Sequence, residues 1–203
     1  FSLEIELGGR VAGIDEVGRG PLAGPVFAAA VVLTPAAAQR LAALGLTDSK
    51  ALPRPRREAL SAAIHDLGEV SIREASVDEI EEINILQAAL LAMRRACADL
   101  GSAPAAALVD GNRDPGLSCP TRTIVKGDGR CLSIAAASVV AKVARDRHMC
   151  RLAEAHPGYG WERNAGYGTA EHLAALTHLG ITPHHRRGFA PVARLLIDSN
   201  LAT

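Results

Sequence analysis

The chain has few aromatic residues and no excess of either charge. Phe, Trp and Tyr make up 3% of its 203 residues, and 22 Lys and Arg balance 22 Asp and Glu. A net charge of zero argues against the strongly basic surface of a protein that holds nucleic acid by charge alone. It leaves room for a local basic face around an acidic centre.

Long apolar runs and CxxC cysteine pairs are also missing, and we expect no signal peptide within residues 1–10. No apolar run reaches the roughly 18 residues needed to cross a bilayer, and residues 1–10 are too charged for a signal peptide. The four cysteines contain no CxxC pair, which disfavours a zinc ribbon and favours free thiols in a reducing cytosol. We expect a soluble, cytoplasmic monomer with no membrane contact.

Apolar residues, many of them alanine, dominate what is present. They make up 48% of the chain, which predicts a true core rather than disorder. A chain of this length buries about 70% of the surface that its unfolded form exposes, so we expect one domain over residues 1–203. Small apolar side chains allow helices to pack closely on a sheet.

The apolar pattern predicts strands and helices that alternate along the chain. Residues 18–25 are dense in Gly and Pro and form a loop so short that the strands on either side are expected to be antiparallel. This order predicts an α/β fold with a mixed sheet of about five strands flanked by helices. The expected strands are 11–17, 26–33, 70–75, 105–109 and 121–125; the expected helices are 53–67, 77–100, 133–152, one starting at Thr169, and 192–201.

Four carboxylates stand at or near the ends of these strands. Asp15 and Glu16 interrupt an otherwise apolar strand, where charged side chains are rare unless paired or bound to a metal. Asp110 and Asp128 each follow a strand. Taken singly, Asp15-Glu16 could mark the point where a strand reaches the protein surface. Asp110-Gly111 or Asp128-Gly129 could each be an ordinary turn. Their shared position favours one site, because ligands gather at strand ends in open α/β sheets.

Four carboxylates at one site repel each other, and divalent cations relieve the repulsion. At a separation of ~5 Å and an effective dielectric constant of ~20, each pair costs about 3 kcal/mol. An all-oxygen set favours Mg²⁺ or Mn²⁺, and two such ions can catalyse phosphodiester hydrolysis. Asp15 and Glu16 should point to opposite faces of a regular strand. We therefore expect a twist or bulge there, or that one of them acts around the strand edge.

With these residues in place, the chain closely resembles the ribonuclease HII family, the bacterial type 2 ribonucleases H. The resemblance covers about residues 11–191 and implies a ribonuclease H-like fold with a helical C-terminal extension over about residues 160–203. The blocks that carry it are Ala12-Gly13-Ile14-Asp15-Glu16-Val17-Gly18-Arg19-Gly20-Pro21, Asp48-Ser49-Lys50, Ile83-Asn84-Ile85-Leu86, Val109-Asp110-Gly111-Asn112, Val125-Lys126-Gly127-Asp128, Ser133-Ile134-Ala135-Ala136-Ala137-Ser138 and Gly166-Tyr167-Gly168-Thr169.

The resemblance implies an endonuclease that hydrolyses the RNA strand of RNA–DNA hybrids. It also implies cutting 5′ of single ribonucleotides in duplex DNA, which leaves a 3′-hydroxyl and a 5′-phosphate and serves ribonucleotide removal in replication and repair. A replication-machinery partner is implied too, for which no binding segment is visible up to Thr203. The metal ligands and catalytic residues for two Mg²⁺ or Mn²⁺ ions would be Asp15, Glu16, Asp110 and Asp128.

Substrate contacts carry over to three further groups of residues. Gly18-Arg19-Gly20 matches the loop that reads the ribose 2′-hydroxyl, where glycines let the backbone approach the sugar closely. Tyr167 matches the tyrosine beside the following sugar, although a half-buried core role would also suit a lone tyrosine. Lys50, Ser138 and Lys142 are candidate phosphate contacts, while Asp146, on the same helical face, could simply pair with Lys142.

The roles of some basic residues remain open, and the chain departs from its relatives at one position. Arg54, Arg56 and Arg57 could grip the nucleic acid backbone or form a solvated helix face, and residues 184–187 (His-His-Arg-Arg) could bind nucleic acid or be structural. Many relatives carry Lys where this chain has Ala165, which weakens the expected phosphate contact there. The competing classes are another ribonuclease H-like nuclease such as a junction resolvase, an actin-like nucleotide-binding protein, and a non-catalytic nucleic-acid binding module.

Overall fold

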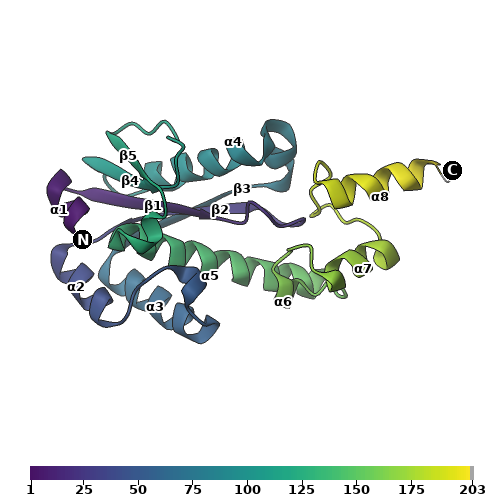
Figure 1. The fold of residues 1–203 in the computed structure, drawn as a ribbon, viewed down its shortest axis with the longest axis horizontal. Helices are drawn as coiled ribbons and strands as arrows, with labels where there is room; N and C mark the ends of the chain where they lie inside the picture. Colours follow the sequence, from purple (N-terminus) through teal and green to yellow (C-terminus); the bar gives the residue numbers. More distant parts are fainter. Residues whose placement is uncertain (202–203) are drawn as a thin grey trace.

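The computed structural model describes residues 1–201, and a mixed five-stranded sheet lies at its centre (Figure 1). The strand order is β3-β2-β1-β4-β5. The predicted mixed sheet and its five strands are confirmed, each within one or two residues. The strands are β1 (Val11–Val17), β2 (Val26–Val32), β3 (Glu69–Ala75), β4 (Ala106–Asp110) and β5 (Thr121–Ile124).

The pairing follows from the length of each connection. The short 18–25 loop turns β1 back onto β2 as an antiparallel pair, as predicted, and β3 continues the antiparallel half. A helix separates β3 from β4, which therefore joins β1 in parallel, and β5 joins β4 in parallel. The carboxyl ends of β1, β4 and β5 thus lie at one end of the sheet.

Helices cover both faces of this sheet (Figure 1). One long helix, α4, packs on one face, while α5, α3 and α2 pack on the other. Helices α6, α7 and α8 follow α5 at the far end of the molecule. The helices are α1 (Ser2–Leu7), α2 (Pro35–Ala43), α3 (Arg54–Leu67), α4 (Val77–Ala98), α5 (Leu132–Ala155), α6 (Trp161–Asn164), α7 (Ala170–Leu179) and α8 (Ala190–Leu201), with short 3-10 turns η1 (Ser49–Ala51) and η2 (Gly127–Gly129).

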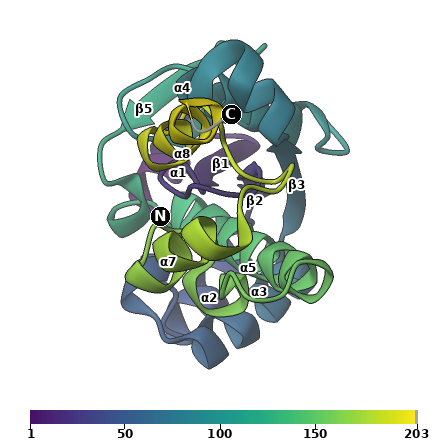
Figure 2. The ribbon, with the colours of Figure 1, turned by 90° about the vertical axis from the view of Figure 1, so that its right-hand side faces the viewer.

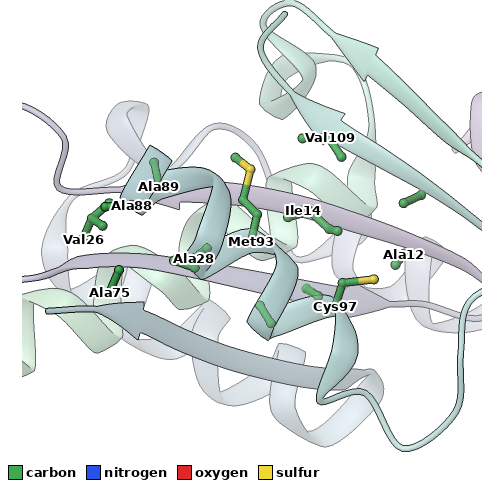
Figure 3. Packing of buried hydrophobic residues seen from close by; sticks show 14 of the residues in the cluster. Ala12, Ile14, Val26, Ala28, Ala75, Ala88, Ala89, Met93, Cys97 and Val109 are labelled. Atoms are coloured by element: carbon green, nitrogen blue, oxygen red, sulfur yellow. The ribbon is translucent and has the colours of Figure 1, made fainter. Parts of the chain in front are cut away.

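Small side chains let the helices approach the sheet closely. Figure 3 shows Ala88, Ala89 and Met93 of α4 lying over Val26 and Ala28 of the sheet. On the opposite face, a Cβ added to Gly13 would lie 2.2 Å from the backbone carbonyl carbon of Ser133 in α5. Because β1 and α5 are in backbone contact at Gly13, the next side chain on this face of β1, two residues further on, is that of Asp15.

The helix predicted over residues 77–100 was wrong in one respect. It begins as predicted, with Ser76 and Glu79 forming a capping box, but Asn84 breaks it at φ 65° and ψ 163°. The Asn84 side chain accepts hydrogen bonds from the N–H groups of Leu86 and Gln87. It therefore caps a second helical segment that the apolar spacing alone does not distinguish from the first.

The segment after α5 packs around a buried aromatic and histidine cluster. Trp161, Tyr159 and His172 are at most 5% exposed, and Thr169 caps α7 through its side chain, as predicted. Figure 2 views the molecule from this end, with α7 and α8 in front of the sheet. No helix among the described residues is long and apolar enough to span a membrane.

Candidate active site

Asp15 and Asp110 occupy matching positions at the ends of two neighbouring parallel strands. The last paired residues, Ile14 and Val109, both face α4, so the next residue in each strand faces α5. Asp15 is 5% exposed, and its Oδ1 accepts a hydrogen bond from the Glu16 N–H at 2.7 Å. Asp110 is therefore a direct neighbour of Asp15 on the α5 face.

Asp128 reaches the same end of the sheet on the η2 turn. Its approach requires a left-handed residue, Lys126 at φ 54°, and the following Gly127 N–H donates to Asp110 Oδ1 at 2.7 Å. Asp128 is 9% exposed, and Lys50 Nζ lies 3.8 Å from its Oδ2. One hydrogen bond thus joins the end of β4 to the turn that carries Asp128.

Glu16 approaches from the other face of the sheet. It lines a cleft together with Asp110, Arg19 and residues of α4 such as Leu86, and Arg19 Nη1 lies 3.4 Å from Glu16 Oε1. The strand therefore keeps its alternation. The regular register of β1 with β2 through Glu16 shows that the expected bulge is not present, and action of Glu16 around the strand edge stays a prediction.

The electrostatics of this group are those of a site with excess negative charge. Burial, followed by the charges of Glu16 and Asp110, holds the pKa of Asp15 well above its usual value. Burial raises the pKa of Glu16 and Asp128 as well, and Asp110 adds to both effects. A cation at this position would remove the repulsion that raises these pKa values.

The donors present fit a hard divalent cation. All four side chains offer carboxylate oxygens, which Mg²⁺ and Mn²⁺ prefer. As the side chains are placed, no three Asp, Glu, His or Cys residues within 1–201 already enclose a metal position. Asp15 Oδ1 and Asp110 Oδ1 are both held by backbone N–H groups. These hydrogen bonds fix the orientation of both carboxylates at the site.

The β1–β2 loop, residues 18–25, lies beside the carboxylates and against Tyr167. The N–H groups of Gly18, Arg19 and Gly20 donate to no protein atom within residues 1–201. A Cβ added to Gly20 would lie 3.6 Å from Tyr167 Cε1, and Tyr167 is 42% exposed. The two substrate-reading motifs expected from the sequence therefore adjoin, with unpaired donors next to an accessible ring.

The remaining predicted contacts lie at different depths. Ser138 is buried, shares a 2.8 Å hydrogen bond with Ser49 Oγ and lies close enough to Asp15 to offset part of the rise in the pKa of that carboxyl. Lys142 Nζ is 2.5 Å from Asp146 Oδ1, the pairing that its helical spacing suggested. The side chain of Lys50 is 81% exposed at the rim. Ser138 and Lys50 thus adjoin the carboxylates, while Lys142 is tied to its neighbour.

The basic residues left open by the sequence take largely structural positions. Arg57 donates to the carbonyl of Ser49 and lies 3.7 Å from Asp146. Within residues 184–187, His185 and Arg186 are at most 1% exposed. Arg145, which was not predicted as a functional residue, is fully buried on α5. Its neighbours Lys142, Asp146 and Arg147 are charged as well, so the sequence of α5 gives no signal that sets Arg145 apart.

Fold and site together define a ribonuclease H-type hydrolase, and comparisons with known proteins agree. The ribonuclease HII family model matches residues 12–192. A ribonuclease HII of Paramagnetospirillum magneticum is 62% identical over 197 residues, 97% of this chain and 98% of that protein. The chain therefore belongs to the ribonuclease HII family: it is a type 2 ribonuclease H, an endonuclease acting on RNA–DNA hybrids.

Solved structures give the same answer at lower identity. The ribonuclease H2 of Pyrococcus horikoshii is similar with a TM-score of 0.81 and 26% identity, covering 95% of this chain and 99% of that one. A ribonuclease HII of Archaeoglobus fulgidus, solved as a complex with PCNA, has a TM-score of 0.72 and 27% identity over 91% of this chain and 96% of that one. The ribonuclease H-like fold is thereby confirmed.

Proposed function

We propose that the chain cuts duplex DNA on the 5′ side of single embedded ribonucleotides, in addition to cutting RNA–DNA hybrids. The observation that carries this proposal is the contact between the β1–β2 loop and Tyr167 beside four carboxylates. The products would be a 3′-hydroxyl and a 5′-phosphate. In the cell this activity would remove misincorporated ribonucleotides during replication and repair.

Asp15, Glu16, Asp110 and Asp128 would hold two divalent cations, Mg²⁺ or Mn²⁺. The raised pKa values of Asp15, Glu16 and Asp128 supply the reason, since burial and mutual repulsion disfavour so many charges without a counter-ion. When bound, such ions activate a water molecule and stabilise the leaving 3′-oxygen of a phosphodiester. The carboxylates fix their positions, and hydrogen bonds from the N–H groups of Glu16 and Gly127 orient two of these carboxylates.

The β1–β2 loop would select the ribonucleotide through its backbone. A ribose 2′-hydroxyl both donates and accepts hydrogen bonds. The three free N–H groups of Gly18, Arg19 and Gly20 provide donors on the side of the site where the loop lies beside the carboxylates. Gly18 has a φ of 97°, a conformation that side chains other than glycine rarely adopt. The exposed ring of Tyr167 would lie against the next sugar, where a deoxyribose fits and a 2′-hydroxyl would be crowded.

Phosphate contacts would come first from the rim. Lys50 is exposed and within 3.8 Å of Asp128, so a phosphate drawn to the metals would come near its ammonium group. Ser138 could contribute a hydroxyl from the floor of the site. Lys142 would first have to leave Asp146. Because Lys50 is the exposed cation and Lys142 is paired with Asp146, Lys50 should contribute most of the salt-dependent affinity among these three residues.

Residues 1–203 would act as one catalytic domain and as a monomer, with residues after about 160 as its extension. The complex of the Archaeoglobus relative with PCNA supports a replication partner for this chain as well. Two alternatives have a weaker basis. A junction resolvase would have no use for a loop that reads a 2′-hydroxyl, and a non-catalytic binding module would have no need of all four carboxylates.

The test uses Asp15→Asn and Asp110→Asn, which keep the side-chain shape and remove one negative charge each. We expect turnover of a ribonucleotide-containing duplex to fall at least ~10³-fold, while affinity for the same duplex changes little. Glu6→Gln, which removes one exposed carboxylate on α1 outside the site, serves as a matched control. Full activity in either Asn variant would refute the assignment of the carboxylates.

A further inference from the structure

Two arginines are completely buried beneath the β1–β2 loop. Arg145 on α5 and Arg186 in the segment before α8 are both 0% exposed. Neither forms a salt bridge with any residue within the described range 1–201. Burial lowers the pKa of Arg145 to about 10 and that of Arg186 to about 9, so both guanidinium groups stay charged at neutral pH. A buried charge without an acidic partner is costly and calls for a reason.

Backbone carbonyls of the loop take the place of that acidic partner. Arg186 donates to the carbonyls of Gly18 at 2.6 Å, Arg19 at 3.0 Å and Gly24 at 2.7 Å. These three acceptors belong to two separate stretches of the loop. One planar guanidinium thus holds both ends of the loop in a single geometry.

Arg145 holds the other carbonyls and links them to the tyrosine segment. Its guanidinium donates to the carbonyls of Ala23 and Pro25, each at 3.0 Å, and of Ala165 at 2.9 Å. Ala165 lies two residues before Tyr167. Gly18 packs directly on this guanidinium, because an added Cβ would lie 2.2 Å from Arg145 Nε.

Together the two residues turn the loop's acceptors inward. The backbone N–H of Arg186 also donates to the Leu22 carbonyl at 2.8 Å. Six of the eight carbonyls in residues 18–25 therefore accept hydrogen bonds from Arg145 or Arg186. The N–H groups of Gly18, Arg19 and Gly20 are left free within the described chain. The loop therefore keeps donors, rather than acceptors, available for a substrate whose backbone is anionic.

We propose that Arg145 and Arg186 are positioning residues that determine preference for a ribonucleotide, by fixing the β1–β2 loop and the Tyr167 segment in one register. The inference rests on the proposed function of that loop. Neither guanidinium reaches the reacting atoms, since both are fully buried and each hydrogen-bonds three backbone carbonyls. Their effect on the reaction is transmitted through the positions of the loop N–H groups and of the tyrosine ring.

Lysine is the variant that separates this role from simple charge. A guanidinium presents five donors in a rigid planar fork, whereas an ammonium group carries the same charge on three rotatable donors. Arg186→Lys would keep the buried positive charge. With one nitrogen and three N–H groups it could not keep all four hydrogen bonds that the three guanidinium nitrogens make to Gly18, Arg19 and Gly24. A role limited to charge would survive this substitution, and a positioning role would not.

The experiment measures binding of two duplexes in an Asp110→Asn background, which prevents cleavage. One is all DNA and the other carries a single ribonucleotide; fluorescence anisotropy gives both affinities. We expect the unaltered loop to prefer the ribonucleotide duplex, and Arg186→Lys to lose about tenfold of that preference while binding all-DNA duplex equally well. Arg145→Lys should do the same, and exposed Arg40→Lys should keep the preference.

Two controls keep the outcomes distinct. Circular dichroism and thermal unfolding establish which variants are folded, and Mn²⁺ binding by the same variants with Asp110 restored reports on the carboxylates without any cleavage measurement. A folded lysine variant at either position that keeps the full preference would overturn the positioning role alone. An unaltered loop with no preference for the ribonucleotide would overturn the proposed function, and this inference with it.

Discussion

The indole N–H of Trp161 donates a hydrogen bond to His172 Nε2 at 3.0 Å, within the buried C-terminal cluster. His172 Nδ1 faces the Tyr167 carbonyl at 2.9 Å, so this nitrogen carries the proton and Nε2 accepts. His185 Nε2 lies 3.1 Å from the same acceptor, and His185 Nδ1 accepts from the Thr182 N–H. Each ring nitrogen thus has one role, and both histidines are held neutral.

This network predicts that the fold loses stability in mild acid. Burial lowers the pKa of His172, and burial together with His172 lowers that of His185 to about 4 from 6.5. Between pH 6.5 and about 4 the unfolded chain binds protons that the folded chain refuses, so the histidines' contribution is complete above pH 6.5 and is lost as the pH falls. The free energy of unfolding, obtained from urea titrations at pH 7.0, 6.0 and 5.0, measures this loss of stability.

The carboxylates act in the opposite direction and require a matched comparison. The raised pKa of Asp15 favours the folded state as the pH falls. The histidine effect is therefore taken as the difference between the unaltered chain and His185→Gln, whose free energy of unfolding should vary less between pH 7.0 and 5.0. Equal pH dependence in both proteins would contradict the neutral network.

Gly13→Ala should destabilise the fold severely, because the added methyl would overlap the backbone of α5. The Cβ would lie 2.2 Å from the Ser133 carbonyl carbon and 2.4 Å from the Ile134 nitrogen, so strand and helix must separate. We expect a loss of about 3 kcal/mol. Gly101→Ala, whose Cβ would meet only the Glu69 side chain at 3.5 Å, should cost far less in the same thermal unfolding series.

Asn84 should be more sensitive to alanine than to glycine. Its φ of 65° and ψ of 163° lie in a region used almost only by glycine, while its side chain caps the helical segment after it. Asn84→Gly relieves the backbone and loses the cap; Asn84→Ala keeps the strain and loses the cap. The free energy of unfolding of the Asn84→Ala variant should therefore be about 2 kcal/mol lower than that of the Asn84→Gly variant. The reverse order would show that the backbone at the kink is not strained.

Mg²⁺ or Mn²⁺ should stabilise the folded chain through the carboxylates. A ligand at 100 times its dissociation constant adds about 2.7 kcal/mol, and Asp110→Asn should lose most of the resulting rise in melting temperature. Glu6→Gln, on α1 and ion-paired with Arg122, is the matched control because it removes one carboxylate outside the site. An undiminished rise in Asp110→Asn would place the cations elsewhere.

The sequence predicted the site's carboxylates better than it predicted how they are supported. Asp15 and Asp128 stood out because each is a charged residue in or after an apolar strand, and strand ends meet at one edge of a sheet. The hydrogen bond from Gly127 to Asp110 could not be predicted, because it depends on the left-handed turn at Lys126. A local pattern identifies a charged residue, but its partners are fixed by tertiary structure.

The same limit applied to the helices and to the buried arginines. Residues 77–100 keep their apolar spacing through Asn84, so periodicity alone gave one continuous helix. Helix α2, which begins at Pro35 behind a Thr34 cap, was not predicted, although its capping residue and proline were visible. Arg186 sat in a basic run that suited nucleic acid equally well, and only its contacts with Gly18 and Gly24, more than 160 residues away, reveal its buried position.

Cleavage of a labelled DNA duplex carrying one ribonucleotide tests the central claim most directly. The duplex is incubated with Mg²⁺ or Mn²⁺, beside an all-DNA duplex, a long RNA–DNA hybrid and an EDTA control. We predict a single metal-dependent cut on the 5′ side of the ribonucleotide, with a 3′-hydroxyl end and no cutting of all-DNA. Cutting of the long hybrid with no cut at the single ribonucleotide would contradict the roles proposed for the β1–β2 loop and Tyr167.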